Sequence, residues 1–123
     1  MKKLLFVCLV FASSAVFAEW AKLSENDETI VYIDLSTVRK DGNLRTVSQL
    51  HDDKKRGEDG VKSTRISWEY DCNSERVRIV SATSFPETMA GGKKLFSFYK
   101  TSEWRDIAPE TAGYNGLKAV CAP

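Results

Sequence analysis

The chain has 123 residues, of which 42% are hydrophobic, and its 18 Lys and Arg residues nearly balance 17 Asp and Glu residues. This length accommodates one hydrophobic core and leaves no room for a second. The near-neutral charge excludes the class of proteins that bind nucleic acids through a basic field, so no nucleic-acid partner is expected.

Residues 1–18 have the layout of a secretory signal peptide. A positively charged start precedes an apolar run over residues 4–11, and Ala18 stands just before the predicted cut. The run is shorter than the roughly 20 residues of a membrane span. We therefore expect an exported protein, periplasmic or on the outer cell surface, with a single domain over residues 19–123. No integral membrane segment is expected after cleavage.

The cysteines predict one disulfide. Cys8 lies in the middle of the apolar run, where a lipid-modified cysteine is not expected, and it leaves with the leader. Cys72 and Cys121 then remain in an oxidising compartment, and we predict that they are bridged. Closing a loop of this length contributes about 4 kcal/mol in the chain-entropy model.

The first half of the chain predicts strands. Residues 29–34 are β-branched and aromatic, which is typical of a strand, and a short strand begins near Trp20 before it. Residues 35–38 are too few for a helix and are interpreted as a turn. Residues 41–43, Asp-Gly-Asn, form a hairpin signal that leads into a strand over residues 44–50.

The second half of the chain contains a segment in which apolar and polar residues alternate strictly. Residues 64–72 place apolar and polar side chains on opposite faces, which predicts a half-buried antiparallel strand. The face predicted to be buried holds Ile66, Trp68 and Tyr70, and the face predicted to be exposed holds Arg65, Ser67 and Glu69. A strand over residues 75–85 returns and ends at Pro86. Residues 89–92 are interpreted as a flexible connection to a sixth strand over residues 93–100.

The end of the chain predicts a helix. Thr111 is a suitable N-cap. One helical stripe holds Tyr114, Leu117 and Cys121. Gly113 and Gly116 each weaken the helix by about 1 kcal/mol relative to alanine, so it needs the sheet and the disulfide. The predicted fold is α+β: a single antiparallel sheet of about six strands with a C-terminal helix packed on it.

Six short motifs follow one another in a recognisable order. They are Val31-Tyr32-Ile33-Asp34, Glu69-Tyr70-Asp71-Cys72, residues 78–83, Met89-Ala90-Gly91-Gly92, residues 104–109 and Ala119-Val120-Cys121. In this order the chain resembles the surface-adhesin protein E-like family of small exported Gram-negative proteins, over nearly all of residues 19–123. The resemblance implies a compact antiparallel sheet, a packed C-terminal helix, a bridged late cysteine pair and binding of host matrix and plasma proteins.

A basic cluster is the best partner-binding candidate. The cluster consists of Lys54, Lys55 and Arg56. It lies within a charged, glycine-containing segment over residues 52–60 that is free of apolar side chains. Such a cluster could meet an acidic protein patch or a sulfated, polyanionic polysaccharide. The alternative is a solvated loop whose own carboxylates cancel its charge. A contact through an exposed sheet edge, including a homodimer, is the remaining alternative.

Catalytic, cofactor and metal sites are not expected. His51 is the only histidine, so no cluster of nitrogen and sulfur ligands for zinc is expected. Nothing in the sequence places His51 near a particular serine, so no Ser–His–Asp set is proposed, and His51 is interpreted as a solvated loop residue. Glu69 and Asp71 are interpreted as cross-strand partners of arginines on the following strand. Trp68 and Trp104 are interpreted as core residues. We expect an exported non-enzymatic binding module; the alternatives are a small hydrolase-like periplasmic enzyme and a structural accessory of the envelope.

Overall fold

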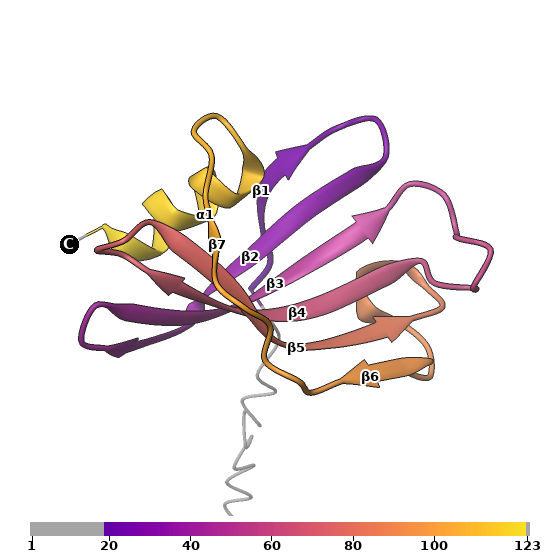
Figure 1. The fold of residues 1–123 in the computed structure, drawn as a ribbon. Helices are drawn as coiled ribbons and strands as arrows, with labels where there is room; N and C mark the ends of the chain where they lie inside the picture. Colours follow the sequence, from indigo (N-terminus) through magenta and orange to yellow (C-terminus); the bar gives the residue numbers. More distant parts are fainter. Residues whose placement is uncertain (1–18, 123) are drawn as a thin grey trace, which may run out of the picture.

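Over residues 19–122 the fold is one antiparallel sheet with a single α-helix on one of its faces (Figure 1). The computed structural model describes residues 19–122. The strands follow one another across the sheet in chain order from β1 to β6, and β7 pairs with β5 beyond the end of β6. The strands are β1 Ala21–Glu25, β2 Thr29–Asp41, β3 Leu44–Asp53, β4 Ser63–Asp71, β5 Arg76–Phe85, β6 Phe96–Phe98 and β7 Arg105–Asp106. The helices are the 3-10 turn η1 Thr88–Ala90 and the α-helix α1 Ala112–Cys121. The predicted fold class is confirmed.

The hairpin between β2 and β3 forms where the sequence predicts it. Asp41 pairs with Leu44, which leaves Gly42 and Asn43 as a two-residue turn. Gly42 has a φ of 60°. Glycine adopts this left-handed conformation without steric cost, which explains why the chain reverses here.

The turn predicted over residues 35–38 is wrong, because β2 continues through this segment. The pairing of β2 with β3 shifts between Asp34 and Arg39. Local side chains fill the gap: Asp34 Oδ1 accepts a hydrogen bond from the Ser36 amide at 3.0 Å, and Thr37 Oγ1 accepts one from the Ser48 amide at 2.9 Å. The polar residues that suggested a turn therefore form an irregularity inside a long strand.

The core lies between the sheet and α1, which packs on β1, β2 and β3. Its buried members are Ile33, Val47, Tyr70, Val77, Leu117 and Val120. The predicted inner face of β4 is confirmed, since Ile66 and Tyr70 are buried and the half-buried Trp68 packs against this core. The disulfide between Cys72 and Cys121 ties the end of β4 to the last residue of α1, with 5.7 Å between their Cα atoms.

The opposite face of β4 is less exposed than the alternation predicts. Arg65 is exposed, but Ser67 and Glu69 are half-buried. Glu69 pairs with Arg78 on β5 at 2.6 Å, and the Arg78 guanidinium lies 4.3 Å from the centre of the Trp104 ring. Trp104 is therefore a half-buried platform for arginine, and its assignment to the core is wrong.

Helix α1 begins at its predicted cap and meets the sheet at a glycine. Thr111 Oγ1 accepts a hydrogen bond from the Tyr114 amide at 3.2 Å. A Cβ atom at Gly116 would lie 2.3 Å from the hydroxyl oxygen of Tyr70, so only glycine allows this approach. That hydroxyl accepts a hydrogen bond from Gln49 Nε2 at 2.6 Å, and burial raises the Tyr70 pKa to about 12.

Candidate partner-binding site

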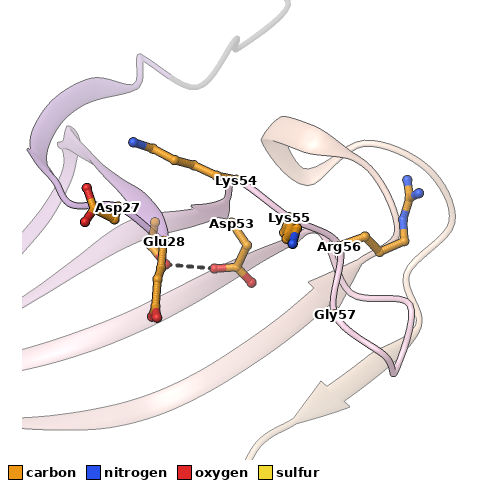
Figure 2. A pocket seen from close by; sticks show the side chains of 8 residues that line it. Asp27, Glu28, Asp53, Lys54, Lys55, Arg56 and Gly57 are labelled. Atoms are coloured by element: carbon orange, nitrogen blue, oxygen red, sulfur yellow. Dashed lines mark hydrogen bonds between the residues drawn. The ribbon is translucent and has the colours of Figure 1, made fainter.

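The basic cluster lies where the chain leaves β3 and crosses to β4. It borders an open hollow of about 420 Å³ between the β1–β2 turn and the start of this loop (Figure 2). The hollow is lined by Asp27, Glu28, Thr29, Asp53, Lys54, Lys55, Arg56 and Gly57. One of its walls is held by a hydrogen bond from Thr29 Oγ1 to Asp53 Oδ1 at 3.0 Å. The loop therefore starts from a fixed position on the sheet.

Lys54 is paired with a carboxylate of β1. Its Nζ atom lies 2.8 Å from Glu25 Oε2. Lys22 forms a second ion pair with the same carboxylate. A hydrogen bond from Lys22, and to a smaller extent one from Lys54, lowers the pKa of Glu25 to about 2. The carboxylate therefore stays charged over the physiological range. The Lys54 ammonium is thus held against β1 by an internal ion pair.

Arg56 points away from Lys54 (Figure 2) and donates hydrogen bonds to the backbone of another loop. Its Nε and Nη2 atoms donate to the carbonyl oxygen of Pro86 at 3.0 Å and 2.8 Å. Pro86 directly follows β5. A guanidinium on a carbonyl keeps its positive charge while losing its freedom to move. Arg56 is therefore a positioned cation.

Lys55 is the freest member of the cluster. Within residues 19–122 it is exposed and takes part in no ion pair. The residues that the sequence groups as one basic patch therefore differ in the structure. Lys54 is engaged by Glu25, Arg56 is anchored, and Lys55 presents its ammonium to solvent.

The residues before the cluster belong to β3, so the predicted loop boundary is wrong. His51 is half-buried, with its ring centre 6.3 Å from that of Trp68, and burial lowers its pKa. Asp52 is 6% exposed and pairs with Lys62 Nζ at 3.0 Å. A signal for this burial existed in the sequence, because Asp52 stands two positions after Leu50 and shares its face on a strand.

Asp52 also fastens the connection that follows β5. It accepts hydrogen bonds from the Thr88 hydroxyl and from the Met89 amide, the latter at 3.3 Å. Ser63 Oγ donates to the Glu87 carbonyl at 2.6 Å and accepts from the Ala90 amide at 2.9 Å. The flexible connection predicted here is therefore the ordered turn η1, held on β3 and β4.

The carboxylates of β4 are engaged in cross-strand pairing. Glu69 meets Arg78 at 2.6 Å, and Asp71 meets Arg76 at 3.6 Å. Among residues 19–122, no three His, Cys, Asp or Glu side chains gather so that they could hold a metal ion. No helix in that part of the chain is long and apolar enough to cross a membrane.

Comparisons with known proteins give one family match and several matches in fold. The family model described as surface-adhesin protein E matches residues 20–122. The fold is similar to that of Haemophilus influenzae protein E, with a TM-score of 0.69 and 17% identity over 86% of this chain and 89% of that chain. A second structure of the same protein gives a TM-score of 0.65 at 17% identity over 86% of both chains. Protein E from non-typeable Haemophilus influenzae gives 0.62 at 18% identity, covering 89% of this chain and 79% of that chain. At these identities the likeness establishes the fold. No curated protein matches the sequence significantly.

Proposed function

The chain belongs to the surface-adhesin protein E family, and on this premise we propose that it is an exported, non-enzymatic protein that binds a host or envelope partner through Lys54, Lys55 and Arg56. The partner is an acidic protein surface or a polyanionic polysaccharide. Residues 1–18 lie outside the described residues and remain a predicted leader, and the domain boundary at residue 19 also remains a prediction. Removal of the predicted leader would leave the protein in the periplasm or on the outer cell surface.

The observation that supports this proposal most is the difference between the three cations. Lys55 is exposed and unpaired among the described residues, while Arg56 is held by the Pro86 carbonyl at 2.8 Å. A free cation beside an anchored one can meet an anion without first losing an internal ion pair.

The test compares a triple Lys54/Lys55/Arg56→Ala variant with the wild type on immobilised heparin and on matrix proteins. Binding by the wild type should weaken as salt rises, because exposed charges are screened beyond about 8 Å at physiological ionic strength. Lys55→Ala alone should lose more binding than Lys54→Ala, because the Lys54 ammonium is already engaged in an ion pair with Glu25.

The matched control removes three exposed basic residues elsewhere: Arg39→Ala, Lys40→Ala and Lys118→Ala. Its net charge equals that of the test variant, so a general electrostatic effect would weaken both equally. Unchanged thermal melts establish that each variant is folded. If the test variant binds as tightly as the wild type, the loop is a solvated surface and the proposed site is wrong.

A further inference from the structure

Strand β6 and its flanks expose an unusual run of large apolar side chains. Leu95 is 42% exposed, Phe96 and Phe98 are each 57% exposed, and Tyr99 is 72% exposed. Single exposed apolar residues are common, but a contiguous group of this size marks an interaction surface or an aggregation hazard. The packing of the sheet leaves these side chains without cover.

This run lies on the free edge of the sheet. Phe96 pairs with Ser84 and Phe98 with Ala82 on β5, and β6 is the last strand in that direction (Figure 1). Its outer side pairs with no strand of residues 19–122. An unpaired strand edge offers alternate amide and carbonyl groups to another extended chain. Both the backbone and the side chains of β6 are therefore available.

Lysines flank the apolar run on both sides. Lys93 and Lys94 precede it and Lys100 follows it, and all three are exposed. None of them forms an ion pair within the described part of the chain. The surface therefore combines an apolar centre with uncompensated positive charge at both ends, which favours a partner with acidic ends.

The same lysines disfavour a second copy of this chain. Antiparallel self-pairing centred on Ser97 would place Lys94 opposite Lys100 twice, and like charges directly opposite each other are destabilising. Lysines on an edge strand are a common protection against such self-pairing. The charge pattern therefore selects a different chain.

A flat membrane surface also fits poorly. Side chains alternate along a strand, so Phe96 and Phe98 share one face of β6, and an extended continuation of the strand would place Leu95 and Tyr99 on the other face. A lipid surface could cover only one of these faces. An added strand contacts both faces, because its own side chains also alternate.

We propose that β6 binds an extended acidic segment of another protein as an additional antiparallel strand. In this arrangement carboxylates of the segment lie opposite Lys94 and Lys100, and β-branched or aromatic residues lie opposite Phe96 and Phe98. The recognised pattern is an acidic residue, then two apolar residues at alternate positions, then a second acidic residue. This surface is distinct from Lys54, Lys55 and Arg56 and works independently of them.

The probe is the blocked peptide Glu-Thr-Val-Ser-Val-Thr-Glu, which has the length of the segment from Lys94 to Lys100. Its control carries lysine in place of both glutamates. In an NMR titration the acidic peptide should shift the amides of residues 94–100 of the full protein, and the lysine peptide should bind about tenfold more weakly.

Charge reversal and removal of the aromatic rings sharpen the test. Lys94→Glu/Lys100→Glu should reverse the preference, so that the lysine peptide binds about tenfold more tightly than the acidic one. Phe96→Ser/Phe98→Ser should weaken binding of the acidic peptide by at least about tenfold. The substituted side chains are all exposed, so thermal melts of these variants should match the wild type.

Four outcomes would overturn the proposal. They are an absence of shifts at millimolar acidic peptide, equal binding of both peptides, sedimentation of the wild type as a dimer that Phe96→Ser/Phe98→Ser dissociates, and binding of β6 to anionic lipid vesicles but not to the peptide. The Lys54/Lys55/Arg56→Ala variant should bind the acidic peptide like the wild type. This variant therefore tests the proposal for the edge strand separately from the proposal for the basic loop.

Discussion

Replacing Gly116 by alanine tests how closely α1 approaches the sheet. The new Cβ atom would lie 2.3 Å from the Tyr70 hydroxyl oxygen, 3.0 Å from Tyr70 Cζ and 3.1 Å from Gln49 Nε2. Tyr70 is only 1% exposed and Gln49 only 4%, so neither side chain can move aside into solvent. The helix must therefore shift away from the sheet.

The magnitude follows from two opposing effects. Overpacking a filled core costs about 1–3 kcal/mol. Alanine in place of glycine within a helix contributes up to about 1 kcal/mol in the opposite direction. We expect a net loss of about 1–2 kcal/mol in the free energy of unfolding, which lowers the Tm by about 4–8 °C for each kcal/mol lost in a domain of this size.

Thermal and denaturant melts measure this loss, and Gly113→Ala is the matched control. A Cβ atom at Gly113 would meet Ile107 Cγ2 at 3.5 Å, an ordinary contact, so that variant should be as stable as the wild type or more stable. Adding Tyr70→Phe to Gly116→Ala removes the nearest atom, and the double variant should lose less than the two single losses combined. A Gly116→Ala protein that melts at or above the wild-type temperature would refute the close approach.

Two further predictions concern the disulfide and His51. Cys72→Ser/Cys121→Ser should lower the free energy of unfolding by about 4 kcal/mol in denaturant melts, because the bridge closes a loop with a sequence separation of 49, and a loss below about 1 kcal/mol would show that the bridge constrains little. Burial lowers the His51 pKa below its ordinary 6.5, so the unfolded chain takes up the proton first and stability should fall as the pH drops from 7.5 to 5.5. His51→Gln should reduce that fall in denaturant midpoints, and an unchanged pH dependence would contradict the burial of the imidazole.

The elements that could be predicted from the sequence depend on local signals. The hairpin at Gly42 needs only a residue that tolerates positive φ, and the helix start at Thr111 needs only a hydroxyl near free amides. The inner face of β4 follows from a period of two. Each of these signals lies within a few residues of its effect, so reading along the chain detects it.

The sequence predicts that the candidate residues lie together in a loop. It does not predict which of their cationic groups are engaged by other parts of the chain. The Pro86 carbonyl that holds Arg56 is 30 residues away in the sequence, and Glu25 lies on a strand beyond β2. Burial of Asp52 likewise depends on Lys62 and η1, which only the folded sheet brings together. The exposure of Phe96 and Phe98 was missed because an apolar strand pattern does not tell whether another layer covers it.

The bridge between Cys72 and Cys121 also determines whether a proteolytic cut separates the chain into two fragments. Every peptide bond between these cysteines lies within one covalent ring. The stretch over residues 92–101 is exposed throughout and carries three lysines, so it offers cleavage sites to trypsin-like proteases. A single cut there opens the ring but releases no fragment. The nicked protein keeps α1 tied to the end of β4, and its two pieces separate only when the bridge is reduced.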